Sequence, residues 1–164
     1  MEGEGTRLAD LAAAVRQSSL KRLRAVSAGQ ENWRPTGDAM SFADLAQHLI
    51  DADRWLFQLL DGRSGDPIVG RPRLREVRAR REYDFLLGEL ESAGAERETR
   101  IAGLGAPELA RRYFDPRFNR EVTVWWGVVR GNLDHEIHHR GQLSVYLRAA
   151  GAATWKAQDD GRPS

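Results

Sequence analysis

Four segments of the chain carry apolar residues at helical spacing, and this periodicity constrains the fold most strongly. The segments span residues 6–26, 41–60, 74–101 and 123–150. In each segment the apolar side chains recur mostly at intervals of three and four residues, which places them on one face of an α-helix. Because no stretch shows a convincing strand pattern, we predict an all-α protein built as a four-helix bundle.

Local signals predict where some of these helices begin and end. Ser41 precedes Asp44 with the S-x-x-D spacing of a capping box, which predicts that the second helix begins there. Thr6 is a candidate cap for the first helix, and Gly151 is typical of the residue that follows a last helical turn. Gly141 lies inside the fourth segment, where glycine costs about 1 kcal/mol relative to alanine. We therefore expect Gly141 to permit the close approach of a neighbouring helix.

The remaining residues are predicted to form the connections between the helices and a C-terminal tail. Residues 61–73 contain three glycines and two prolines and predict a long crossover loop. Residues 108–122 are ambiguous, and the run from Tyr113 to Pro116 indicates a turn or a short extended piece. The polar residues 152–164 predict a flexible tail. No repeat or second pattern interrupts this organisation, so we expect residues 1–164 to form a single domain.

The composition excludes several classes of function. Lys and Arg number 25 against 24 Asp and Glu, so the formal net charge of +1 creates no general attraction for nucleic acid or an anionic membrane. The absence of cysteine excludes disulfides, thiolate ligands and a cysteine nucleophile. No apolar run is long enough to span a bilayer and no signal-peptide pattern is present, so we expect a soluble cytoplasmic protein.

Histidines on two of the predicted helices are the clearest functional signal. His135 and His139 are four residues apart, so a helix presents both imidazoles on one face, a turn apart. That predicted inward face also carries Asn132 and Gln142, while His48 borders the inward face of the second helix. If these helices pack together, three imidazoles converge. Such a set binds a divalent metal such as zinc or nickel and leaves a position open for water or substrate.

Neighbouring polar residues are candidates for other roles. His138 lies about 100° around the helix from His139, so we assign it to the rim of the site or to a helix contact. The catalytic candidates are Glu136 and Asp51, and the substrate-binding candidates are Arg140, Gln142 and His138. The competing interpretations are a solvated carboxylate for Glu136, a surface pair with Arg54 for Asp51, and an ordinary surface position for Arg140.

Residues 135–139 also match H-E-x-x-H, the zincin metalloprotease motif in which the glutamate is the general base. Three fixed positions recur by chance in a charged helix, so the match is weak evidence. The chain also lacks room for the usual second subdomain and has no convincing helix for a third ligand. A protease is therefore disfavoured.

Two blocks of sequence, SFADLAQHLIDADRWLFQLLDG and NLDHEIHHRGQLSVYLRAAG, together resemble the DinB-like (YfiT-like) superfamily. Its pattern is a histidine on the second helix and H-x-x-x-H before R-G-Q on the fourth, which correspond to His48, His135 and His139. The resemblance runs from the first helix to Gly151. The tail from Ala152 departs from the family, because many members have a proline and a further glycine there.

The resemblance implies an up-up-down-down four-helix bundle, a divalent metal on the three histidines and commonly a homodimer. Characterised relatives are transferases or isomerases that use low-molecular-weight thiols such as bacillithiol, mycothiol or glutathione. A thiol cofactor for this chain is therefore an expectation drawn from relatives alone.

Two functions from different classes are compatible with these features. The first is an enzyme in which His48, His135 and His139 hold zinc or nickel, which activates a thiol or water toward a small electrophilic molecule. The second is a non-catalytic, metal-binding stress-response protein whose metal stabilises the bundle. An open coordination position favours the enzyme, whereas a fourth protein ligand such as Asp51 or Glu136 favours the structural role. Nucleic-acid binding is disfavoured by the balanced charge.

Overall fold

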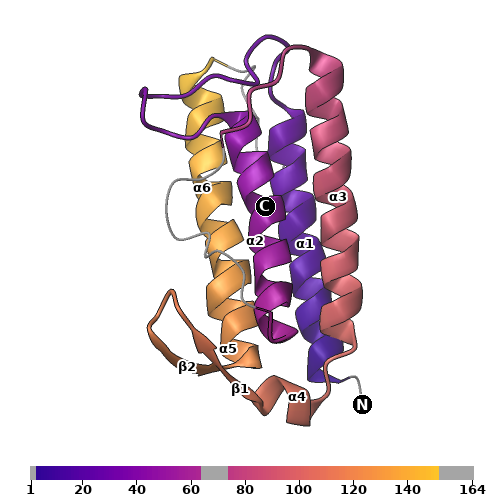
Figure 1. Cartoon of the computed structure of the whole chain (residues 1–164). Coiled ribbons are helices and arrows are strands. Elements are labelled where there is room, and N and C mark those ends of the chain that lie inside the picture. Colours follow the sequence, from indigo (N-terminus) through magenta and orange to yellow (C-terminus); the bar gives the residue numbers. More distant parts are fainter. Residues whose placement is uncertain (1–2, 64–73, 152–164) are drawn as a thin grey trace, which may run out of the picture.

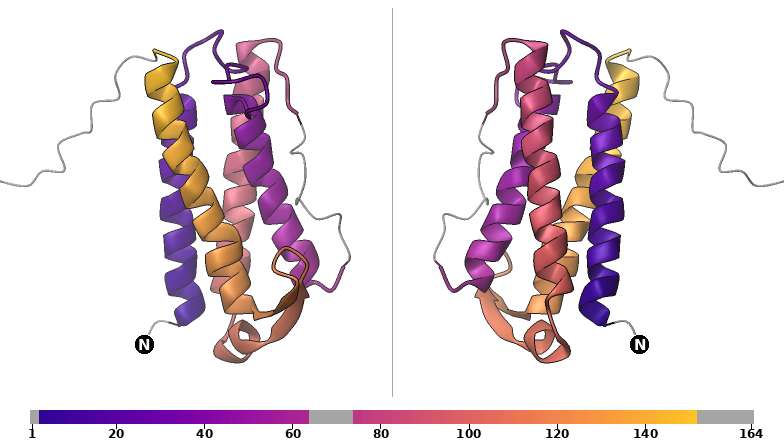
Figure 2. Two further views of the ribbon diagram at one scale, coloured as in Figure 1. Left: turned by 90° about the vertical axis from the view of Figure 1, so that its left-hand side faces the viewer. Right: turned by 90° about the vertical axis from the view of Figure 1, so that its right-hand side faces the viewer.

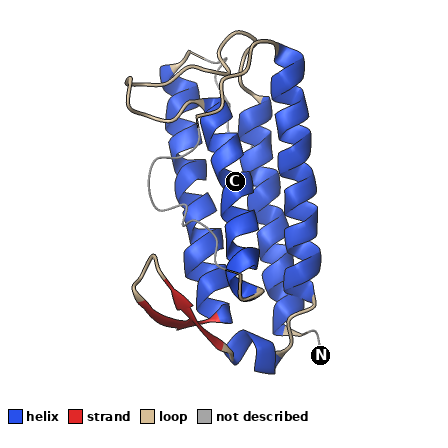
Figure 3. Ribbon diagram, in the orientation of Figure 1, coloured by secondary structure: helices blue, strands red, loops and turns tan. Residues whose placement is uncertain are grey.

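The computed structural model describes residues 3–63 and 74–151, and these residues are mostly helical (Figures 1 and 3). Three long helices make up most of the bundle, and α3 (Arg80–Ala102) packs against both α1 (Glu4–Arg24) and α2 (Phe42–Leu60). A fourth rod, which we call the fourth helix, joins α5 (Val124–Val128), the π-helical segment η1 (Val129–Leu133) and α6 (Asp134–Ala149). In the described part of the chain, no helix combines the length and apolar character needed to cross a membrane.

The helices run up, down, down and up in chain order, as seen in Figure 1. The hydroxyl of Tyr83, early in α3, donates to the carbonyl of Leu23 near the end of α1, so these two helices are antiparallel. Arg100, late in α3, pairs with Asp61 just beyond α2, so α2 and α3 are parallel. The expected up-up-down-down order is therefore wrong.

The two connections explain this difference. Residues 25–41 bring the chain straight back, so α2 runs antiparallel to α1, while both helices pack against α3. The expected crossover falls between the parallel helices α2 and α3. Residues 64–73 of that crossover, like the predicted tail 152–164, lie outside the described residues.

Some predicted helix ends are confirmed, and others differ from the prediction. The Ser41 hydroxyl accepts from the backbone N–H of Asp44 while the Asp44 carboxylate accepts from that of Ser41, which is the predicted capping box. Gly151 has a positive φ of 67° directly after the last turn, as expected. The first helix starts at Glu4 with Gly3 as its N-cap, so Thr6 is not a cap.

The third helix begins at Arg80, later than its apolar pattern predicts. The reason lies in Asn32, whose side-chain amide donates to the carbonyl of Val77 and accepts from its N–H, at 2.6 and 3.0 Å. This pair of hydrogen bonds satisfies the backbone of Val77 outside a helix. Val77 is nevertheless buried, which is why it contributes to the apolar pattern.

A polar layer divides the core into two apolar regions. One region lies toward the end where α2 begins and includes Leu23, Phe42, Leu86 and Leu147. The other lies toward the end where α1 begins. Between them, buried polar side chains come from every long helix: Arg16, His48, Asp53, Arg97, Asn132, Glu136 and His139. Buried polar groups are costly unless they are paired, so this layer is the place to look for a function.

A small cap closes the end of the bundle where α1 begins (Figure 2). It consists of α4 (Ala106–Ala110) and an antiparallel hairpin of β1 (Arg112–Asp115) and β2 (Arg120–Thr123). The short extended piece expected at Tyr113 is thus the first strand of this hairpin. Two glycines of the fourth helix allow the hairpin to approach closely: Gly127 faces the Tyr113 hydroxyl and Gly131 faces the Arg117 guanidinium.

Replacing Gly127 with alanine is expected to destabilise the protein by about 1–3 kcal/mol, because the added methyl group would overlap the Tyr113 side chain. Urea unfolding followed by circular dichroism measures this change.

Gly141→Ala is the matched control. No atom among the described residues lies within 4 Å of a Cβ built there, so the expectation that Gly141 permits a close helix approach is wrong. Gly141→Ala should stabilise the helix by up to about 1 kcal/mol. Equal effects at both positions would contradict the docking of the hairpin through Gly127.

Candidate metal centre

Three imidazoles meet between α2 and the fourth helix, as the sequence predicts. His48 comes from α2, and His135 and His139 come from successive turns of α6. The Nε2 atom of His135 lies 3.0 Å from Nε2 of His48 and 2.9 Å from Nε2 of His139. Among the described residues, these three form a group whose possible ligand atoms all lie within 4.8 Å of one another.

Gln142 orients one of the three rings. Its side-chain Oε1, which can only accept a hydrogen bond, lies 2.6 Å from Nδ1 of His139. Nδ1 of His139 must therefore carry the hydrogen, which leaves the lone pair of a neutral ring on Nε2, facing the other histidines. A hydrogen bond of this kind on the outer nitrogen is the usual support of a metal-binding histidine.

Burial keeps these imidazoles neutral. It lowers the pKa of His135 to about 3, and the neighbouring His139 and His48 lower it further. Burial likewise lowers the pKa of His139, to about 4, and that of His48. The neutral form of imidazole is the one that binds metals, so all three rings have the correct protonation state near neutral pH.

The arrangement fits a cation better than it fits hydrogen bonds among the rings. Nε2 of His135 carries either one hydrogen or one lone pair, so it cannot complete well-directed hydrogen bonds with both His48 and His139. A divalent metal accepts a lone pair from each of the three nitrogens at once. Zinc, nickel and related ions accept neutral imidazole in this way.

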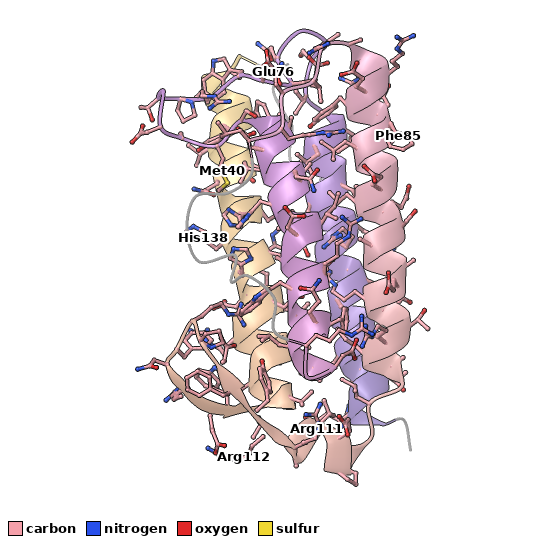
Figure 4. The ribbon with its side chains drawn as sticks, in the orientation of Figure 1. Met40, Glu76, Phe85, Arg111, Arg112 and His138 are labelled. Carbon is pink, nitrogen blue, oxygen red and sulfur yellow. The ribbon has the colours of Figure 1, made fainter. Side chains whose placement is uncertain are left out.

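The substrate-binding candidates lie at different distances from this centre. His138 is exposed and outside the three-histidine group, although its ring centroid is 5.2 Å from that of His139. Figure 4 shows His138 on the side of α6 that faces away from α1 and α3. Arg140 lies near Arg22 of α1. Burial lowers the pKa of the Arg22 guanidinium, and the positive charge of Arg140 lowers it further. Only Gln142 touches one of the three histidines through a hydrogen bond.

The two catalytic candidates, Asp51 and Glu136, also differ in their surroundings. Asp51 is buried and accepts a hydrogen bond from Gln47, so the expected surface position of Asp51 is wrong. Glu136 is 1% exposed, so the interpretation as a solvated carboxylate is wrong as well. Neither carboxylate joins the three-histidine group. Burial alone would raise the pKa of Glu136, but Arg16 and Arg97 outweigh it and lower that pKa to about 2.

Glu136 belongs to a buried charge network that the sequence reading missed. The network contains two guanidinium groups, two carboxylates and one amide: Arg16, Arg97, Asp53, Glu136 and Asn132. A signal for it was present in the helical pattern. Arg97 lies four residues before the buried Ile101, and Asp53 lies between the buried residues Ile50 and Leu56, so both occupy positions that the periodicity assigns to the core.

Comparison with known proteins agrees with this fold. A family model described as the DinB superfamily matches residues 11–143. The crystal structure of a DinB-like protein from Bacillus subtilis, YjoA, matches with a TM-score of 0.67 and 19% sequence identity, covering 90% of this chain and 94% of that one. At this identity the similarity concerns the fold. No curated protein matches the sequence.

Proposed function

The chain belongs to the DinB superfamily, and from that premise we propose that it is an enzyme that depends on a divalent metal held by His48, His135 and His139. The proposed reaction is the transfer of a low-molecular-weight thiol to a small electrophilic molecule, or a related hydrolysis. The observation that carries the proposal is the convergence of three neutral imidazole nitrogens without a fourth ligand from the described residues.

The absence of a fourth ligand among the described residues favours catalysis over a purely structural metal. Structural zinc sites are closed by four protein ligands, whereas catalytic sites keep a position for water or substrate. The Glu136 carboxylate, one of the two expected closing ligands, is held by Arg16 and Arg97 instead. Asp51, the other, lies outside the group.

A bound zinc or nickel ion would act as a Lewis acid that lowers the pKa of a thiol or water molecule at the open position. The chain's own residues provide the remaining features. Gln142 keeps Nε2 of His139 available, and burial keeps the imidazoles neutral. In the transfer, the thiol sulfur forms a bond to the electrophilic carbon, the leaving group departs with its electron pair, and the thiol proton passes to solvent.

The proposal is tested with protein purified without a metal-affinity tag. Elemental analysis should give about one zinc or nickel per chain. Protein loaded with cobalt should then change its visible spectrum when glutathione or another small thiol is added, because the thiol occupies the open position. The same preparation is assayed for transfer of that thiol to chlorodinitrobenzene and for hydrolysis of activated esters.

The alternative function, a metal-binding stress-response protein, predicts a different result. Metal would be present and its removal would lower the melting temperature, but the cobalt spectrum would not respond to thiols and neither reaction would occur. Protein without metal, even after dialysis against zinc or nickel, would contradict both functions. The homodimer expected from the family resemblance and the cytoplasmic location expected from the sequence both stay predictions.

A further inference from the structure

The buried charge network connects the two helices that carry the metal ligands. Asp53 lies five residues after His48 on α2, and Glu136 directly follows His135 on α6. These two carboxylates do not hydrogen-bond to each other. They are joined by arginines from the helices that carry no histidine ligand, Arg16 of α1 and Arg97 of α3.

Each arginine contacts both carboxylates. Arg97 Nη1 lies 3.0 Å from Asp53 Oδ1 and 2.6 Å from Glu136 Oε2. Arg16 Nη2 lies 2.8 Å from Asp53 Oδ2 and 3.0 Å from Glu136 Oε2, and its Nε lies 2.9 Å from Glu136 Oε1. The two guanidinium groups thus form a double bridge between α2 and α6. Both arginines are also fixed to backbone carbonyls, those of Leu90 and Ala12.

Asn132 extends the bridge into the π-helical segment of the fourth helix. Its Nδ2 donates to Asp53 Oδ1 at 2.9 Å, and its Oδ1 accepts from Arg97 at 3.1 Å. A π turn contains about one residue more than an α turn, so it changes the direction in which every later side chain of the helix points. The hydrogen bonds of Asn132 fix this segment immediately before His135.

We propose that Asp53 and Glu136 are positioning residues for the metal centre, because the arginine bridge between them fixes the separation and rotation of the helices that carry His48, His135 and His139. The backbones of α2 and α6 are in contact over a smaller stretch than those of α1 and α3, so direct helix packing does less to set their spacing. Charge-assisted, bidentate hydrogen bonds are short and directional, which suits them to this task. This inference rests on the proposed metal function.

The test uses two isosteric variants, Asp53→Asn and Glu136→Gln. Each keeps the shape of the side chain but turns one acceptor toward an arginine into an NH₂ group, which breaks part of the bridge. Zinc affinity, measured by competition with a chelator of known affinity, is expected to fall about 10- to 100-fold in each variant. The cobalt spectrum should also shift, because the angles between the ligands change.

Leu86→Ala is the matched control for loss of stability alone. Leu86 is a fully buried residue of α3 in the apolar region next to the start of α2, and it takes no part in the bridge. This variant should lower the melting temperature but leave the zinc affinity and the cobalt spectrum of the folded protein unchanged. A loss of affinity in Leu86→Ala as large as that in Asp53→Asn would assign the network a merely structural role and overturn the proposal.

A metal-free readout separates this proposal from the proposed function. In crystals of the metal-free protein, the distance between Nε2 of His48 and Nε2 of His135, 3.0 Å here, should increase in both isosteric variants. An increase would support the positioning role even if the wild-type protein bound no metal, a result that would contradict only the enzymatic proposal. Unchanged imidazole positions together with unchanged zinc affinity would overturn the positioning role. If Glu136→Gln does not fold, Asp53→Asn alone decides the result.

Discussion

Replacing Arg97 with methionine is expected to lower the free energy of unfolding by about 3–5 kcal/mol. Arg97 is 0% exposed and its guanidinium contacts both Asp53 and Glu136. Methionine fills a similar volume but leaves two buried carboxylates with Arg16 as their remaining cationic partner. An uncompensated buried charge is far more costly than the loss of a surface ion pair.

Urea unfolding at neutral pH, followed by circular dichroism, measures this change. Arg112→Met is the matched control, because Arg112 is exposed and its ion pair with Glu121 spans 3.4 Å. That substitution should change the free energy of unfolding by no more than about 0.5 kcal/mol. If the two variants lose similar stability, the buried network is not a major contributor to the fold.

The second large effect concerns the metal ligands. His135→Ala and His139→Ala are each expected to lower zinc affinity by about 100-fold or more, since each removes one of three nitrogen ligands. His138→Ala should bind zinc nearly as tightly as the wild type, because His138 is exposed and outside the ligand group. Isothermal titration calorimetry with zinc gives both the affinity and the number of sites.

The comparison among the three variants tests the choice of ligands directly. Similar losses of affinity in all three would show that the metal binds to the histidine-rich surface of α6 in general. A loss in His138→Ala together with retention in His139→Ala would move the site to the other face of the helix. The stability of each variant should be measured in parallel, so that a failure to bind is not confused with unfolding.

The sequence was sufficient to predict the helices and the convergence of the histidines because both depend on local spacing. The four-residue interval between His135 and His139 determines that they share a helical face. The capping box of Ser41 and Asp44 likewise involves residues only three positions apart. The sequence also predicts that His48 meets these two histidines, because the helix that carries His48 has a recognisable inward face.

The features that sequence reading missed depend on residues far apart in the chain. Glu136 resembles any other acidic residue of a charged helix until Arg16 is found 120 positions away, bonded to its carboxylate. The direction of α2 relative to α1 is set by how residues 25–41 fold back, which helical periodicity does not describe. The hairpin of residues 112–123 is short, and its stabilising contacts with Gly127 and Gly131 are tertiary.

The charge network also affects how this protein can fold. Its members come from α1, α2, α3 and the fourth helix, so each long helix contributes a charged or strongly polar group that is satisfied only by the others. A partly assembled bundle of three helices would bury at least one of these groups without its partners, at a high cost in free energy. Partially folded states are therefore strongly penalised. The chain is expected to gain its native structure in one cooperative transition, with the histidines assembled only when the last helix is in place.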